Sequence, residues 1–265
     1  MGKLKDYIKV YKTTFKLNLK SLMIYDTDFI IGVIAMIIKT AIKFSMLLIL
    51  FNLITNIQGW TFEEMLFLYG FSTTACAIWH CFFIDTITIP YYIKTGEFDR
   101  FLMKPYNPLF LILIEGFDED GWGELLFGII ISIIAIIRLK VFTPLIILLP
   151  ILWIAASLIY AGIAILLSTI SFFTIGNADI TDVTIELNEF SKYPLSIYGT
   201  GLKTIFTFII PIGFTAYYPS LVFIKDTTYN NISWMFGTIL VGISFFIISC
   251  YIWMKVLKKY TSSGY

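Results

Sequence analysis

The sequence predicts an all-α integral membrane protein with six transmembrane helices, and two observations support this prediction. The first is composition: 58% of the 265 residues are hydrophobic and only 14% are charged. The mean hydropathy of +0.85 is far above that of a soluble globular domain. The second is the length of the apolar runs, several of which reach the roughly 20 residues that a helix needs to cross about 30 Å of hydrocarbon.

We therefore expect a single transmembrane domain over residues 1–265. A basic interfacial helix is expected over 1–28, six spans over 29–256 and a cytoplasmic tail over 257–265. The net charge of +1 does not indicate an acidic partner, and we expect no nucleic-acid partner.

The first 28 residues predict an amphipathic helix at the membrane surface. Apolar residues recur at helical spacing, and lysines form an adjacent stripe. The apolar set is Leu4, Ile8, Tyr11, Phe15, Leu19 and Leu22, and the lysines are Lys5, Lys9, Lys12, Lys16 and Lys20. Such a helix places its lysines among anionic headgroups, so membrane lipids are expected partners. The alternative is a topology signal that only orients the first span.

Six apolar runs predict the spans: Phe29–Ile54, Phe62–Ile89, Leu125–Ile137, Leu145–Phe173, Ile205–Ile224 and Ile232–Val256. The third is short unless Gly121–Glu124 extends it. The first is long enough to stay in the mature protein, so we expect no cleaved signal peptide. Of the 19 Lys and Arg residues, 14 fall in segments that this topology places on the same side as both termini. Lys192 and Lys203 are counted among these 14. The positive-inside rule then predicts cytoplasmic termini, in a bacterial-type cell membrane.

A short charged segment, YIKTGEFDRFLMKPYNP at 92–108, lies between the second and third spans. Gly96 permits a sharp entry and Pro105 prevents a helix from continuing. Between them, Glu97 and Asp99 lie near the start and Lys104 at the end, so the charges complement the dipole of a helix over Glu97–Lys104. The candidate functional residues are Gly96, Glu97, Phe98, Asp99, Arg100, Phe101, Leu102, Lys104 and Pro105.

Helical spacing would place the apolar residues of this segment, Phe98, Phe101 and Leu102, on one face. It would also let Glu97 pair with Arg100 on another face. On spacing alone, a solvated connecting loop is the favoured interpretation.

The run GEFDRFLMKPYNPL, which begins at Gly96, resembles the segment between the second and third spans in permease subunits of type-2 ATP-binding-cassette (ABC) exporters, the six-span ABC-2 group. Three further pieces match in order: YPLSIY at Tyr193–Tyr198, IPIGFTAYYPS at Ile210–Ser220 and KKYTSSGY at Lys258–Tyr265. The resemblance covers about residues 60–265. It implies that Glu97–Lys104 is a coupling helix that docks on a cytoplasmic ATPase.

The resemblance also implies partners. ATP and Mg would be bound by separate ATPase subunits, since GTGLKT at Gly199–Thr204 lacks the order of a phosphate-binding loop. A second permease, identical or paralogous, would complete the pore, because six spans are half of the usual number in this family. The chain would then be half of a translocation pore without cofactor, metal site or covalent chemistry of its own.

Two lysines lie inside the first span. Lys39 and Lys43 are four residues apart, on one helix face near mid-bilayer. A lysine facing lipid there costs about 2.5–3.5 kcal/mol, so we expect a water-filled cavity, an acidic group or the partner permease beside them. Either they line a translocation path that favours anionic or carbonyl-rich groups, or they form a structural pair at a subunit interface. Pro211 and Pro219 interrupt the predicted fifth span and mark a candidate outer gate.

A third amphipathic stretch follows the fourth span. Four acidic residues recur at 3-4-3 spacing on one helix face: Asp179, Asp182, Glu186 and Glu189. We expect a cytoplasmic helix whose acidic face either contacts a basic patch on the ATPase or is solvated. A second acidic cluster, Glu115 with residues 118–120, is interpreted as the solvated start of the third span.

Two other functions remain open. An ion-coupled secondary transporter would need membrane-embedded carboxylates, yet Asp85 and Glu63 lie near span ends. A non-transporting scaffold or immunity protein would need no pore, and the two lysines of the first span weigh only modestly against it. His80, the single histidine, lies one turn from Cys76 but about 100° around the helix from Cys81, so we expect no metal site.

Overall fold

The computed structural model describes residues 2–24, 26–115, 118, 120–174, 179–224 and 229–261, and these residues form helices, turns and loops with no strand. The prediction of an all-α membrane protein is confirmed. Five helical stretches are long and apolar enough to cross a membrane: Asp26–Leu53, Phe62–Thr95, Gly121–Leu139, Pro144–Phe172 and Ile232–Leu257.

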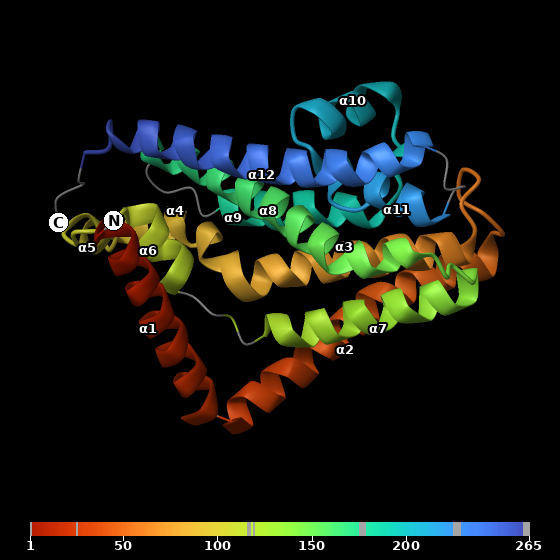
Figure 1. The fold of residues 1–265 in the computed structure, drawn as a ribbon, viewed down its shortest axis with the longest axis horizontal. Helices are drawn as coiled ribbons and strands as arrows, with labels where there is room; N and C mark the ends of the chain where they lie inside the picture. Colours follow the sequence, from red (N-terminus) through yellow and green to blue (C-terminus); the bar gives the residue numbers. More distant parts are fainter. Residues whose placement is uncertain are drawn as a thin grey trace.

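The bundle consists of long helices that run back and forth along one axis (Figure 1). They are α2 (Asp26–Leu53), α3 (Phe62–Phe83), α7 (Gly121–Leu139), α8 (Leu149–Ser168) and α12 (Tyr229–Leu257). The third predicted span does include Gly121–Glu124. The N-terminal stretch forms the predicted helix, α1 (Gly2–Ile24), which lies across one end of the bundle (Figure 1).

Local chemistry accounts for the packing of α3. The helix begins at a capping box, in which the Thr61 hydroxyl accepts from the Glu64 backbone N–H at 3.3 Å and the Glu64 carboxylate accepts from the Thr61 N–H at 2.9 Å. Its contact with α7 depends on small residues. A Cβ added at Gly70 would lie 2.7 Å from the Ser132 backbone, and one added at Gly128 would lie 2.7 Å from the Thr74 backbone. Close backbone approach of this kind is how helices associate in a membrane.

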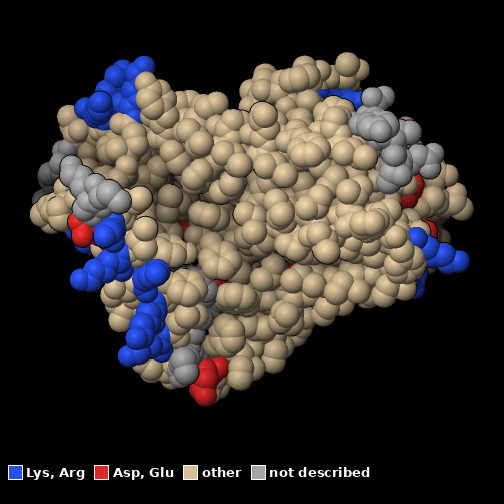
Figure 2. All heavy atoms as spheres, viewed as in Figure 1, with Lys and Arg blue, Asp and Glu red and all other residues tan. Residues whose placement is uncertain are grey.

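The two ends of the bundle differ. The end that carries both chain termini, here called the terminal end, holds η1 (Ile84–Ile87), α4 (Ile89–Thr95), α5 (Asp99–Leu102) and α6 (Pro108–Glu115) (Figure 1). The opposite end holds the 54–61 loop, η2 (Pro144–Leu148), α10 (Thr200–Phe208), η6 (Ile212–Phe214) and α11 (Tyr217–Ile224). On the face drawn in Figure 2, Lys and Arg gather mainly at the terminal end, and a broad uncharged surface separates the two ends.

The fifth passage through the bundle is made by a polar segment, which corrects the prediction of a cytoplasmic helix over residues 179–189. This segment comprises α9 (Asp179–Glu189), η4 (Phe190–Lys192) and η5 (Leu195–Ile197). Its contacts follow α3 in antiparallel order. The Thr181 hydroxyl donates to the Ile87 carbonyl at 2.8 Å, the hydroxyls of Ser191 and Ser72 are 2.6 Å apart, and the Trp60 indole donates to the Ser196 hydroxyl at 3.1 Å. The segment therefore runs from the terminal end to the opposite end.

The predicted fifth span over Ile205–Ile224 is not one straight helix. It is divided into α10 and α11, which are bent by 74° at a short break. Pro211 lies at this break, as predicted, whereas Pro219 lies in the first turn of α11 and does not interrupt it. Both prolines are buried. The Tyr218 ring stacks on Trp234, with centroids 4.4 Å apart, and this contact packs the bent pair against the start of α12.

These corrections move two lysines out of the set assigned to the terminal side. Lys192 lies inside the bundle, with 5% of its surface exposed, and Lys203 lies on α10 at the opposite end. The remaining basic residues still favour the terminal end, so the predicted orientation does not depend on either lysine.

Candidate functional site

A charged cavity of about 290 Å³ opens between α2, α3, α7 and α9. It brings together ionisable side chains that are far apart in the sequence: Lys39, Lys43, His80, Asp118, Glu124, Glu189 and Lys192. Apolar side chains, including Met36, Trp79 and Ile185, complete its wall. We call this space the charged cavity.

Glu189 joins two lysines across this cavity. Its carboxylate accepts from the Lys43 ammonium at 2.7 Å and from the Lys192 ammonium at 2.8 and 2.9 Å. The Lys192 side chain is nearly buried, whereas those of Lys43 and Glu189 are 44% and 41% exposed. The Lys192 ammonium also lies 5.6 Å from the Tyr69 ring centroid. A buried ammonium is stable only when it is paired, so Glu189 and the Tyr69 ring together account for a lysine at this position.

His80 lies between two carboxylates. Its Nε2 is 3.1 Å from Asp118 Oδ2, and its Nδ1 is 3.2 Å from Glu124 Oε2. A neutral imidazole carries only one N–H, so donation to both carboxylates requires the protonated ring. Burial raises the pKa of Asp118, but the hydrogen bond from His80 and its charge outweigh burial, and the pKa is lowered overall.

Lys39 lines the same cavity one turn away from Lys43 on α2. Its side chain is exposed, and no ion-pair partner occurs for it among the residues that the structure describes. Both lysines of the first span thus face a cavity, and Lys43 meets an acidic group, as predicted. Their role in transport stays a prediction.

Sequence reasoning missed His80, Glu124 and Lys192 as members of this site. Glu124 directly precedes the apolar run 125–137, and Lys192 is three residues from Glu189, a spacing that pairs them on one helix face. These signals could have identified both residues. The four acidic residues predicted to share one face of α9 do not all lie in the same environment. Glu189 enters the cavity, Asp182 and Glu186 are exposed, and the side chain of Asp179 lies outside the described residues.

The predicted coupling segment is held tightly against the terminal end of the bundle. α4 ends at Gly96, whose φ of 76° is left-handed and suits glycine. The predicted helix over Glu97–Lys104 is shortened to α5, Asp99–Leu102. Phe98 and Phe101 are completely buried, and the Phe98 ring packs against Phe172 and Trp253 at centroid distances of 5.6 and 6.0 Å.

This burial corrects the predicted apolar face. Phe98 and Phe101 pack into the chain itself, while Leu102 is exposed. The single turn of α5 is too short to present a continuous stripe. η3 (Thr169–Phe172), which follows α8, and the end of α12 supply a core for the Phe98 ring, and Phe101 packs beside Phe98. The two phenylalanines therefore anchor the segment and do not form its outer surface.

Arg100 pairs with Glu115 of α6 at 3.4 Å, not with Glu97 as predicted. Its guanidinium carbon also lies over the rings of Tyr92 and Phe101, 5.1 and 4.7 Å from their centroids. Asp99 accepts a hydrogen bond from the Tyr260 hydroxyl at 3.2 Å. Burial and then the negative charge of Asp99 raise the pKa of Tyr260 to about 12.

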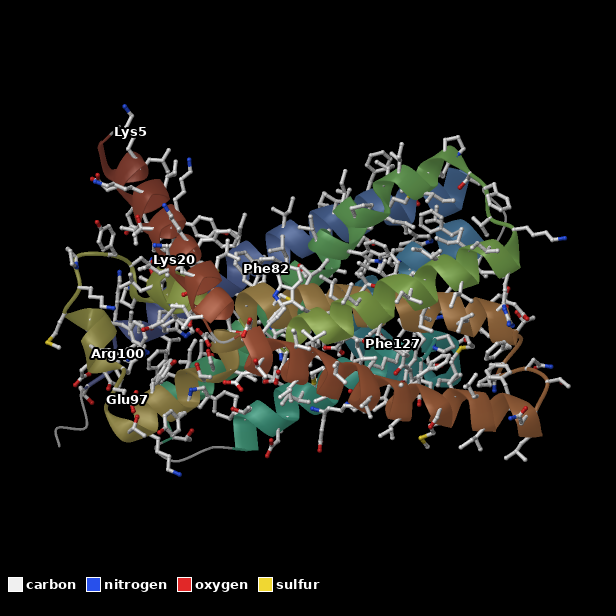
Figure 3. The ribbon with its side chains drawn as sticks, turned by 90° about the horizontal axis from the view of Figure 1, so that it is seen from below. Lys5, Lys20, Phe82, Glu97, Arg100 and Phe127 are labelled. Atoms are coloured by element: carbon white, nitrogen blue, oxygen red, sulfur yellow. The ribbon has the colours of Figure 1, made fainter. Side chains whose placement is uncertain are left out.

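The outward side of the segment is a compact exposed tip formed by Glu97 and residues 102–105. Met103 of this tip is 81% exposed, and sequence reasoning did not single it out. Figure 3 shows Glu97 and Arg100 at the terminal end of the molecule, away from the middle of the bundle.

The bundle thus combines a charged cavity among its helices with an exposed tip at one end. A family model described as ABC-2 family transporter protein matches residues 27–264. The chain belongs to the ABC-2 family. The match covers every long helix of the bundle but not α1. Comparisons with curated proteins and with solved structures return no match.

The ABC-2 match makes the chain a multi-pass membrane permease of an ABC transporter. Within this ABC-2 permease, the charged cavity lies among the helices and the exposed tip lies on the terminal end.

Proposed function

We propose that the chain is half of the translocation pore of an exporter, driven by separate ATPase subunits that bind ATP and Mg at the terminal end. A second permease, identical or related, would complete the pore. The terminal end would face the cytoplasm of a bacterial-type cell, which its concentration of lysines supports.

The charged cavity is the observation that carries this proposal. Ionisable groups inside a membrane bundle are costly and mark substrate or ion pathways. Here they come from α2, α3, α7 and the polar segment of α9, η4 and η5, which runs along α3 from one end of the bundle to the other. Lys39 provides a cation that no described carboxylate neutralises. We assign Lys39 to the translocation path, where it would favour an anionic or carbonyl-rich group of the substrate.

The exposed tip would receive the ATPase. Glu97 and Lys104 offer charges and Leu102 and Met103 offer apolar surface. Movement of the tip would reach the bundle through two contacts of the residues between its parts: the buried Phe98 ring on Trp253 of α12, and the half-exposed Arg100 ion pair to Glu115 of α6. α4, which precedes the tip, continues from α3 and η1, and α3 carries His80 into the charged cavity.

A charge reversal tests the tip. In the complex purified from the native host, Glu97→Lys should abolish stimulation of ATP hydrolysis by the permease while membrane insertion and the melting temperature stay unchanged. Glu97 is exposed, and surface substitutions usually change stability by less than about 0.5 kcal/mol. Arg138→Glu, at the opposite end, is the matched control. If no ATPase copurifies, or if Glu97→Lys leaves stimulation intact, the coupling role is wrong.

A substitution in the cavity tests the path. Lys39→Gln should change substrate-stimulated ATP hydrolysis without changing assembly of the complex, and Lys140→Gln at the opposite end should change neither. Lost assembly with unchanged transport would instead make Lys39 a structural residue at a subunit interface.

An ion-coupled transporter is the second candidate, because the structure places Glu124 and Glu189 in the cavity with His80. Sealed vesicles that contain the chain without an ATPase separate the two functions. The exporter should show no transport under an imposed proton gradient, and gradient-driven transport would favour the second candidate.

A further inference from the structure

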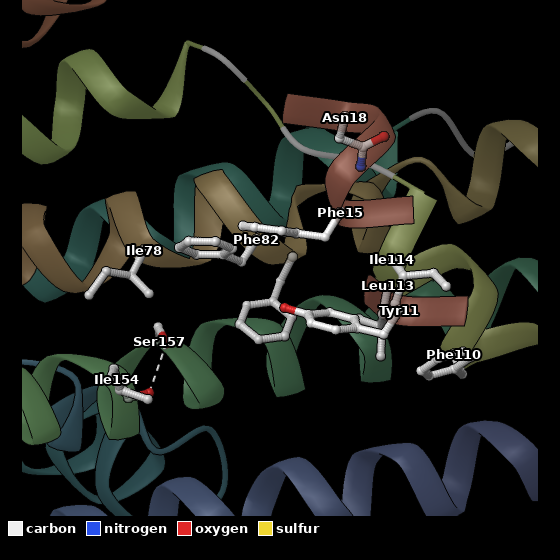
Figure 4. A pocket seen from close by; sticks show the side chains of 11 residues that line it. Tyr11, Phe15, Asn18, Ile78, Phe82, Phe110, Leu113, Ile114, Ile154 and Ser157 are labelled. Atoms are coloured by element: carbon white, nitrogen blue, oxygen red, sulfur yellow. Dashed lines mark hydrogen bonds between the residues drawn. The ribbon is translucent and has the colours of Figure 1, made fainter. Parts of the chain in front are cut away.

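A second cavity, here called the apolar pocket, lies on the other side of α3 from the charged cavity. It has a volume of about 410 Å³, within the range of pockets that hold small ligands, and is bounded by α1, α3, α6 and α8. Figure 4 shows Tyr11 and Phe15 of α1 facing Phe82 of α3 and Leu113 of α6 across it.

The interior of this pocket suits a hydrocarbon chain. Its two polar side chains other than Tyr11 are already used: the Ser157 hydroxyl donates to the Ile154 carbonyl at 2.8 Å, and the Asn18 amide donates to the Glu115 carbonyl at 3.3 Å. The pocket also reaches deep into the bundle. Ile154 precedes the end of α8 at Ser168 by 14 residues, which is roughly 21 Å of helix at 1.5 Å per residue. That distance exceeds the roughly 15 Å that one leaflet contributes to the hydrocarbon core, so it is long enough for the acyl layer of one leaflet.

The outer side of α1 suits an anion. Its stripe of exposed lysines is Lys5, Lys9, Lys12, Lys16 and Lys20. Among the described residues, none of these five lysines has an ion-pair partner. Figure 3 shows Lys5 and Lys20 toward the two ends of α1. Lys12 is three residues from Phe15, so it borders the pocket side of the helix. Lys16 lies one turn further along, on the same face as Lys12, within reach of a phosphate at that edge.

We propose that the apolar pocket binds one acyl chain of an anionic phospholipid from the leaflet at the terminal end, with its phosphate held by Lys12 and Lys16. Charge complementarity selects this occupant, because a neutral lipid would leave the lysine stripe without a counter-ion. The α1 wall of the pocket and both lysines lie outside the residues that match the ABC-2 family model, whereas the walls from α3, α6 and α8 lie within them.

A bound lipid would also steady the coupling segment. α1 contacts both ends of α6, the helix that follows the tip. At its start the Tyr7 hydroxyl accepts from the Asn107 N–H at 3.0 Å, and at its end Asn18 donates to the Glu115 carbonyl. Lipid beneath α1 would hold these contacts in place.

Native mass spectrometry of the detergent-purified full chain tests the proposal, with phosphatidylglycerol and phosphatidylcholine of the same acyl chains as probes. The unaltered chain should retain one phosphatidylglycerol in preference to phosphatidylcholine. Lys12→Gln with Lys16→Gln should weaken phosphatidylglycerol retention by roughly 30-fold, since each lysine near an anionic lipid contributes about fivefold. The control is Lys258→Gln with Lys259→Gln, two lysines at the same end but outside α1, which should retain the lipid normally.

A second variant tests the pocket itself. Ile154→Trp should fill the cavity and lower retention of both lipids, whereas Ile133→Trp, on the exposed face of α7, should not. The proposal is overturned if the unaltered chain retains both lipids equally, if the paired lysine variant retains phosphatidylglycerol normally, or if Ile154→Trp has no effect. None of these measurements needs an ATPase, so they are independent of the proposed transport function.

Discussion

The charged cavity and the apolar pocket share one wall, and α3 separates them. Cys76 and His80 face the charged cavity, while Ile78 and Phe82 face the apolar pocket. Residues four apart share a helix face, and residues two apart point about 200° away from each other. One turn of α3 can therefore separate the charged cavity from the apolar pocket.

The two spaces also differ in how they are held together. The charged cavity depends on pairs of opposite charges, so removal of one partner leaves another charge stranded. The apolar pocket depends on packing and on α1, whose lysines have no described carboxylate partner. The first should be sensitive to single charge changes, and the second to volume and to the surrounding lipid.

The largest expected effect is loss of Glu189. Glu189→Gln would leave the nearly buried Lys192 without a counter-charge, and breaking a buried pair costs about 3–5 kcal/mol. Because Glu189 is itself partly exposed, we expect the lower part of this range, measured by thermal unfolding in detergent. Glu186→Gln, on the exposed face of α9, is the control and should be nearly neutral. Equal effects of the two changes would show that the cavity is not held by this pair.

A smaller effect should distinguish the two faces of α3. Ile78→Ser removes packed apolar volume from the pocket side and should cost about 2 kcal/mol. Cys76→Ser, two residues earlier, changes little volume beside a polar cavity and should cost less than about 1 kcal/mol. The same thermal assay measures both. A larger loss for Cys76→Ser would reverse the assignment of the two faces.

The smallest effect concerns pH. Asp118 has a lowered pKa in the folded protein, so its contribution to stability is present above its unfolded pKa of about 3.9 and is lost as pH falls through the lower folded value. His80→Gln removes the hydrogen bond and charge that lower this pKa. The loss of stability on acidification below about pH 4 should therefore be smaller in the variant. If the unaltered chain and His80→Gln have identical pH profiles of the melting temperature, His80 does not lower the pKa of Asp118.

Much of the fold could be predicted from local patterns. Apolar length identified α2, α3, α7, α8 and α12, the lysine pattern identified α1, and Pro211 marked the break before η6. The charged cavity was predictable only in part. Lys39 and Lys43 stood out because a charge within a long apolar run must find a polar environment.

The coupling segment shows the limit of such reasoning. Gly96 and Pro105 correctly bounded a short element, but spacing could not show that Phe98 and Phe101 are buried. An amphipathic pattern identifies which residues share a face, and it does not show whether that face meets the chain's own core or another protein.

The sequence by itself determined which segments are apolar enough to span a membrane, because that property depends on the length and composition of each run alone. Only the tertiary structure showed that α9, η4 and η5 together make the fifth passage and that α10 and α11 fold back at the opposite end. The physical reason is that Glu189 of α9 has one charged partner that is distant in sequence. Lys192 is only three residues away, but Lys43 of α2 is 146 residues away, and no local pattern records that contact.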